Sequence, residues 1–119
     1  MAIFPAKKDF TIQRRADFGL RLQFKDGDSN NMNLNGFTVD GEVWENTRTT
    51  KFADFGITYT NRQNGIVDVL LTDTQTTTFT PDELEYDFLL TDPSGKKEYY
   101  LQGTLFIEQG YTTWAIQIK

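Results

Sequence analysis

The chain has 119 residues, the size of one domain, and a formal net charge of −5 at pH 7. It contains no cysteine and no histidine, which excludes disulfides, thiolate or imidazole metal sites, and catalytic dyads built on either residue. Its scattered Lys and Arg disfavour nucleic acid as a partner, and no apolar run is long enough to span a membrane.

Alternating apolar and polar residues predict strands along most of the chain. Thr, Tyr, Phe and Val, which favour strands, are plentiful, and helix formers such as Ala are scarce. Short strands separated by regular turns predict a β-sandwich or barrel. The runs with a period of two residues are 18–25, 37–44, 66–71, 84–91, 99–107 and 114–118.

Three segments between these runs have the composition of turns. Asp26 to Asn31 is a polar loop. Asn61 to Gly65 ends in an Asn-Gly pair that accepts positive φ, which predicts a hairpin. Asp92-Pro93-Ser94-Gly95 has the sequence of a type I turn followed by a left-handed glycine, and it predicts a second hairpin.

Two further segments depart from the strand pattern. Thr47 to Asp54 is polar and irregular, so we expect a crossover between two sheets there. Thr72 to Thr78 is either one helical turn capped by Thr72 or Asp73, or an extended loop. From shared parity within each run, the predicted core consists of Leu20, Leu22, Phe24, Val39, Val43, Val67, Val69, Tyr86, Phe88, Leu101 and Leu105.

Two groups of acidic residues are candidates for a cation-binding or a catalytic site. Asp26, Asp28 and Asn30 have the spacing that opens a calcium loop, but the required Gly and bidentate Glu are absent. A solvated turn is the favoured interpretation, and a weak cation site is the alternative. Glu83, Glu85 and Asp87 would project from one strand face about 7 Å apart, a spacing that glycosidases use. A half-buried strand with a charged face in water explains them better.

Aromatic residues supply the candidate interface. Parity places Trp44, Tyr100 and Phe106 on faces opposite the core. If the three rings share one outer face, they form an exposed hydrophobic patch. A protein interface is favoured over a platform that stacks on sugars.

Both ends of the chain carry apolar groups that extend this candidate interface. Ile3 and Phe4 belong to a predicted N-terminal arm, residues 1–8, for which we expect contact with a partner. Tyr111 can anchor a last strand around Trp114; pairing of residues 113–118 within the chain is favoured over addition to a neighbour.

The order of these motifs resembles the Ig-like N-terminal domain of the phage upper baseplate protein family, and small virion proteins of cyanophage genomes. The likeness covers about residues 9 to 111. In that family further modules follow the domain, whereas this sequence stops at Lys119, so baseplate, tail and capsid positions stay open. The matching segments are Phe18 to Phe24, Leu34 to Val39, Asn64 to Val67, Asp73 to Thr76, Tyr86 to Gly95, and Gly103 to Ile107.

The resemblance implies an all-β fold, a single Ig-like antiparallel β-sandwich of about 7–9 strands over residues 9–119. It implies a structural component of a bacteriophage virion, either baseplate- or tail-associated or a capsid decoration protein. We expect no enzymatic activity and no cofactor, other phage structural proteins or further copies of the chain as partners, and synthesis in the host cytoplasm before incorporation in the virion. The alternative function is a carbohydrate-binding module for host attachment.

Overall fold

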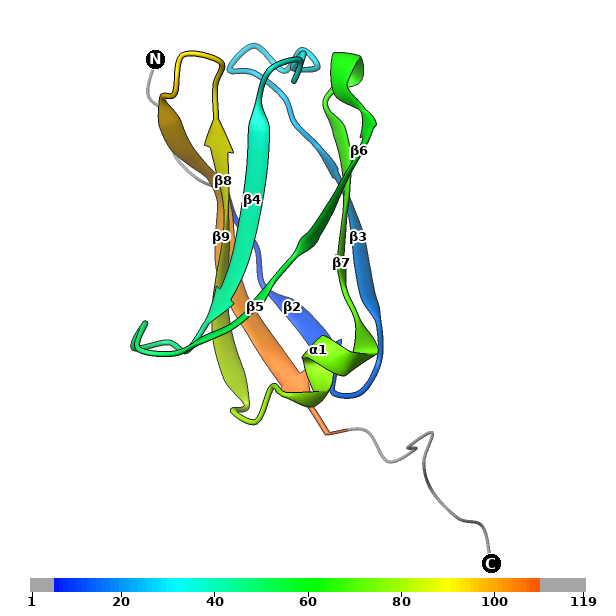
Figure 1. The fold of residues 1–119 in the computed structure, drawn as a ribbon, viewed down its shortest axis with the longest axis vertical. Helices are drawn as coiled ribbons and strands as arrows, with labels where there is room; N and C mark the ends of the chain where they lie inside the picture. The colour runs from blue at the N-terminus through cyan, green and yellow to red at the C-terminus, as the bar shows by residue number, and fades with distance from the viewer. Residues whose placement is uncertain (1–5, 110–119) are drawn as a thin grey trace, which may run out of the picture.

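The computed structural model describes residues 6–109, which form two facing β-sheets (Figure 1). The large sheet has the order β1-β9-β8-β4-β5, with β2 also paired to β9, and the small sheet has the order β3-β7-β6. The elements are β1 (Ala6–Lys7), β2 (Phe10–Gln13), β3 (Phe18–Gln23), β4 (Thr38–Trp44), β5 (Lys51–Asp54), β6 (Gly56–Asn61), the 3₁₀ turn η1 (Arg62–Asn64), β7 (Ile66–Leu71), α1 (Asp73–Thr77), β8 (Glu83–Thr91) and β9 (Lys97–Glu108).

The strand order is that of an Ig-like sandwich, as the resemblance implied. The sets β3-β7-β6 and β4-β8-β9 correspond to the two antiparallel sheets of an Ig domain. β1 and β2 are the exception, because both pair in parallel with β9. Residues 6 and 7 of the predicted N-terminal arm therefore belong to the sheet. Residues 1–5 of that arm lie outside the described residues, as does the predicted strand at 113–118.

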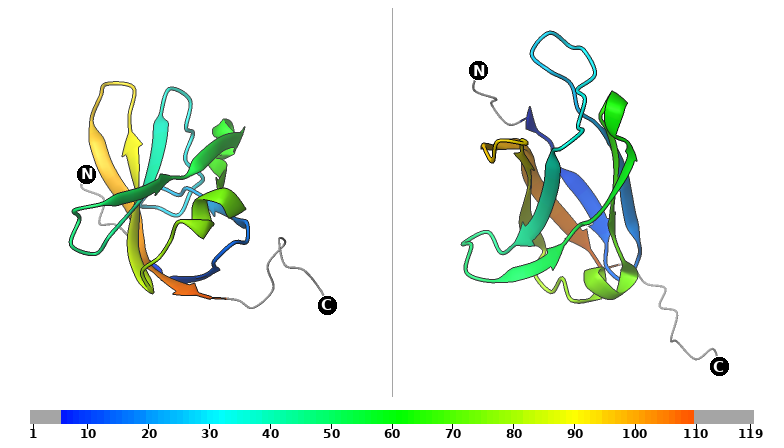
Figure 2. Two further views of the ribbon diagram at one scale, coloured as in Figure 1. Left: turned by 60° about the horizontal axis from the view of Figure 1, so that its bottom comes forward. Right: turned by 45° about the horizontal axis from the view of Figure 1, so that its top comes forward.

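The crossover between the sheets lies later than the sequence predicted. Lys51 to Asp54 is not irregular but forms β5, an antiparallel partner of β4. A bulge opposite Val43 and Trp44 inserts Phe52, which breaks the alternation that would have marked this strand. The chain changes sheets at Phe55, whose amide donates to the carbonyl of Gly41 at 2.9 Å. In both views of Figure 2, β5 continues into β6 across the side of the sandwich.

The predicted turns form as their residues require. Thr72 caps α1 in a capping box with Gln75, so the helical alternative for this segment is the right one. Gly65 and Gly95 adopt positive φ of 73° and 95° at the two predicted hairpins. The first hairpin encloses η1 rather than a two-residue turn.

The core is arranged around the two aromatic rings of β8. Phe88 lies opposite Gly41 of β4, and Tyr86 lies opposite Gly103 of β9. A Cβ at Gly41 would overlap the Phe88 ring, and a Cβ at Gly103 would overlap the carbonyl of Lys8. The Phe88 ring therefore covers Gly41, whereas the space at Gly103 is occupied by the backbone of Lys8. Phe55 completes the group, 4.7 Å from the Phe88 ring centroid.

Most of the predicted core is buried. Leu20, Leu22 and Leu101 are the exceptions, because they are only partly buried against the core. Large buried residues that the prediction left out lie in β2, near the ends of β7, β8 and β9, or in the connections between strands: Ile12, Leu34, Phe55, Leu71, Phe79, Leu84, Leu90 and Ile107.

Replacing Phe88 with Ala should lower the free energy of unfolding by about 3–5 kcal/mol, since the truncation leaves a cavity against Gly41 and Phe55. Chemical denaturation measures the change. Leu89→Ala, on the opposite face of β8, is the matched control and should cost about 1 kcal/mol. A loss below about 1 kcal/mol for Phe88→Ala would contradict this assignment of faces.

Candidate interaction surface

The outer face of the large sheet gathers carboxylates and aromatic rings from three adjacent strands. We call it the acidic face. Its side chains alternate with the core residues of the same strands, and none of the aromatic residues on it is fully buried. The acidic face consists of Asp40, Glu42 and Trp44 on β4, Glu83, Glu85, Asp87 and Leu89 on β8, and Tyr99 and Phe106 on β9.

Trp44 stands in a hollow of about 230 Å³ on the acidic face. Its indole Nε1 donates to Glu42 Oε1 at 2.8 Å, and the Arg48 guanidinium lies 5.4 Å from its ring centroid. These two contacts hold the half-buried ring in place. The hollow is lined by Asp40, Glu42, Trp44, Arg48, Asp87, Leu89 and Tyr99.

Asp87 is the half-buried carboxylate of this hollow that lacks a partner in the described part of the chain. It lies directly opposite Glu42 across β4 and β8, a like-charge pair. Among residues 6–109 its carboxylate has no hydrogen bond or ion pair. Burial, followed by the charge of Glu42, raises the pKa of Asp87, and Arg48 opposes this rise. A ligand that supplied a donor or a positive charge would therefore be favoured here.

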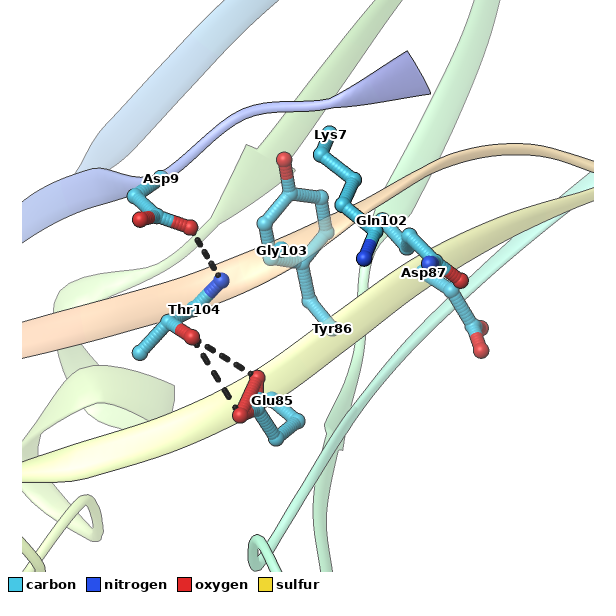
Figure 3. Close-up of a pocket in the computed structure, with 8 residues that line it drawn as sticks. All are labelled: Lys7, Asp9, Glu85, Tyr86, Asp87, Gln102, Gly103 and Thr104. Carbon is cyan, nitrogen blue, oxygen red and sulfur yellow. Dashed lines mark hydrogen bonds between the residues drawn. The ribbon is translucent and has the colours of Figure 1, made fainter. Parts of the chain in front are cut away.

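A second hollow of about 400 Å³ lies beside the first, between β8, β9 and the link from β1 to β2 (Figure 3). Several of its polar groups are already paired. Asp9 Oδ1 accepts from the Thr104 amide at 2.9 Å, and the Thr104 hydroxyl donates to Glu85 at 3.0 Å. The Tyr86 hydroxyl donates to the Lys8 carbonyl at 2.5 Å. Burial, with a smaller effect of Asp9, raises the pKa of Tyr86 to about 12. This hollow is held together by its own residues.

The structure brings two of the three predicted outer aromatics to one face and moves the third inside. Trp44 and Phe106, which is 41% exposed, lie on the acidic face with β8 between them. Tyr100 instead packs on Phe24 with ring centroids 4.5 Å apart. The parity prediction for Tyr100 is wrong because a bulge opposite Phe88 and Leu89 inserts one extra residue in β9.

That bulge exposes a residue that sequence analysis missed. Tyr99 takes the outward position and is 46% exposed. Only the doubled Tyr99-Tyr100 pair hinted that the parity was ambiguous. The other predicted interface residues, Ile3, Phe4, Tyr111 and Trp114, lie outside the described residues.

The predicted cation candidates lie on an exposed loop. Asp26 Oδ1 accepts from the amides of Asp28 and Asn30 at 2.9 and 3.0 Å, so this carboxylate holds the turn. Nowhere in residues 6–109 do three or more acidic side chains converge as metal ligands would. Within the same residues, no helix has the length and apolar composition needed to cross a membrane.

Comparisons with known proteins give a likeness of fold. No protein-family model matches the sequence, and no curated protein matches it either. The N-terminal domain of phage TP901-1 ORF48 superimposes with a TM-score of 0.61 and 9% identity, over 89% of this chain and 91% of that chain. The Lin-41 filamin domain matches with a TM-score of 0.48 and 17% identity, over 84% of each chain. A phage protein domain thus shares the fold of nearly the whole chain.

Replacing Glu42 with Gln should lower the pKa of Asp87, because it removes the charge that opposes ionisation. A carbon-detected NMR titration of the Asp87 carboxyl measures this shift. The pKa is raised in the folded chain, so ionisation of Asp87 reduces stability as pH rises from the ordinary value of 3.8 to the raised one, and not beyond. Glu83→Gln on the same face is the control and should leave the pKa unchanged; an equal shift there would contradict the assignment.

Proposed function

We propose that the chain is a structural component of a bacteriophage particle that acts through contacts with other particle proteins. The observation that carries this proposal is the fold shared with a phage protein domain, at a TM-score of 0.61 over 89% of the chain. The site residues suit this role, since the exposed aromatic rings and carboxylates lie on one sheet face and call for no chemistry.

The packing of the resembled motifs supports a relation at the level of the fold. Gly36, with φ of 81°, lies so close to Pro93 that an added Cβ would be 2.9 Å from its ring. Arg62 donates to the carbonyls of Leu34 and Phe37 at 3.0 and 2.8 Å. Two motifs that carried the resemblance therefore meet at one end of the sandwich. On that ground we propose a relation to the upper baseplate domain, with a position in the baseplate, the tail or the capsid surface.

The proposed role is non-enzymatic and needs no cofactor. Two of the three aligned carboxylates of β8 differ in their surroundings: Glu85 is bound by Thr104, whereas Asp87 faces Glu42. The acidic face also repels a phosphate backbone, which favours protein partners over nucleic acid. In this proposal the chain is made in the host cytoplasm and leaves the cell in the virion.

The test is incorporation into particles. Particles purified on a density gradient from a culture that produces this chain should contain it at a fixed ratio to the other structural proteins. Quantitative mass spectrometry of separated heads and tails should then assign it to one of them. If the chain stays with the free proteins at the top of the gradient, the structural role is refuted.

A carbohydrate-binding module is the second candidate, and the Trp44 hollow is the observation that favours it. An aromatic ring beside acceptors and a guanidinium is the usual composition of a shallow sugar site. Two features weigh against it: Arg48 lies over the indole, and Tyr100 is turned inward. We rank this function below the structural role.

If the hollow binds glycans, Trp44→Ala should abolish glycan-induced shifts in the NMR spectra of Leu89 and Tyr99. Phe106→Ala, an exposed aromatic on the same face but outside the hollow, is the matched control and should retain them. A glycan screen in which the native chain binds nothing, or in which both variants bind equally, would eliminate this site.

A further inference from the structure

The small sheet ends on one side in a strand whose outer edge is unpaired. β3 pairs with β7 over all six of its residues and, among residues 6–109, with no other strand. Its pairing contains no bulge, whereas the pairings of the edge strands β5 and β6 are both bulged. Bulges and short strands are ways in which sheets block addition of a further strand. The edge of β3 has neither protection.

The backbone groups on this edge can be assigned from the hydrogen bonds beyond the strand. The Phe24 amide donates to the Gly65 carbonyl at 2.8 Å, on the side of β7. Because direction alternates along a strand, Leu20 and Leu22 also face β7. The N–H and C=O groups of Gly19, Arg21 and Gln23 therefore point away from the sheet. Successive groups on this edge lie about 7 Å apart.

At Lys25, the next outward-facing residue after Gln23, the same edge already has a partner. The Tyr100 hydroxyl accepts from the Lys25 amide at 2.7 Å and donates to the Lys25 carbonyl at 2.9 Å. A side chain from the opposite sheet thus satisfies both backbone groups, as a neighbouring strand would. No group in the described part of the chain satisfies the outward-facing backbone groups of Gly19, Arg21 and Gln23 in this way.

The apolar side chains of β3 are incompletely covered on this side. Phe18, Leu20 and Leu22 point inward but stay partly exposed, although Val67, Val69 and Leu71 directly opposite on β7 are buried. The two rows face the same core, so the difference lies in what flanks them. A strand added beside β3 would cover this row as well as the backbone edge.

We propose that the edge of β3 is a docking site for an extended acidic segment of a partner protein, which adds as a fourth strand to the small sheet. Only an extended backbone presents donors and acceptors at the spacing of Gly19, Arg21 and Gln23. The inference goes beyond the proposed particle role and holds for any partner with such a segment.

Charge selects the occupant. Arg21 and Lys25 lie beside the edge; Asp68 pairs with Arg21 at 2.8 Å, and Lys25 has no ion pair in the described residues. Acidic side chains on the added strand would face these cations. A second copy fits less well, because the antiparallel register that pairs all three edge residues of both copies sets Arg21 against Arg21.

The test uses a blocked peptide, Thr-Glu-Val-Glu-Val-Glu, with amide hydrogen exchange and chemical shifts followed by NMR. In the free chain, the amides of Gly19, Arg21 and Gln23 should exchange about 100-fold faster than those of Leu20 and Leu22. The peptide should slow exchange at the three edge amides and shift their signals. The same peptide with Lys in place of Glu should bind at least about tenfold more weakly.

Gly19→Pro removes one edge donor without the loss of a side chain, at a position where a strand tolerates proline. Gly19→Ala is the matched control, since its Cβ would meet only Val69 O at 3.9 Å and Leu70 Cδ1 at 4.0 Å. Thermal melting curves should first show that both variants are folded. Gly19→Pro should then lose peptide binding, and Gly19→Ala should retain it.

Three results would overturn the proposal. The edge amides could already be protected in the dilute free chain, which would mean that another part of the chain covers them. Protection that increases with protein concentration would assign the edge to a second copy. Peptide binding that Gly19→Pro leaves intact, or shifts confined to the Trp44 hollow, would place the peptide elsewhere. Absence of the chain from phage particles would refute the particle role alone.

Discussion

Gly41 and Gly103, the residues opposite Phe88 and Tyr86 of β8, are the positions on which the other features of the large sheet depend. A Cβ at Gly41 would overlap the Phe88 ring, so glycine leaves the room that this ring needs. At Gly103 the corresponding space admits the Lys8 carbonyl, which Tyr86 binds. This contact holds the link from β1 to β2 against β9, with which both strands pair. Since β1 and β2 pair with β9, β3 has β7 as its one strand partner among residues 6–109.

The outer face is shaped by the same strands, because alternation forces Glu85 and Asp87 outward wherever Tyr86 and Phe88 point inward. Asp87 and Glu42 are directly opposed for this reason, although like charges in that position are unfavourable. Arg48 offsets part of the cost from the loop that follows β4. A partner in the proposed particle role would supply the donor that Asp87 lacks among residues 6–109.

The fold was predictable from the sequence to the extent that local patterns determine it. Alternation located β3, β4, β7, β8 and β9, and Gly65 and Gly95 marked the hairpins correctly because only particular residues accept positive φ. Thr72 to Thr78 stayed undecided between a helical turn and a loop for two reasons. The stabilisation from a helix cap is small, and the hydrogen bond of buried Thr76 to the Ala16 carbonyl is a tertiary contact. β5 was missed since a bulge disturbs its period, and β1 and β2 since parallel pairing with β9 is a long-range contact. β6 was predictable but missed, because Ile57 and Tyr59 alternate with Thr58 and Thr60.

The candidate surface was harder to predict, and the single extra residue in β9 explains why. Parity placed Tyr100 outside, but the bulge reverses the order of the tyrosines: Tyr99 joins the Trp44 hollow and Tyr100 reaches Phe24 and Lys25. The insertion acts on both proposed contact regions, since it adds a ring to the acidic face and closes one end of the β3 edge. Without the bulge in β9, Tyr100 would point to solvent and the backbone amide and carbonyl of Lys25 would lose the hydroxyl that pairs with them. The boundary of the open edge is therefore determined by a bulge in the opposite sheet, which local sequence patterns do not reveal.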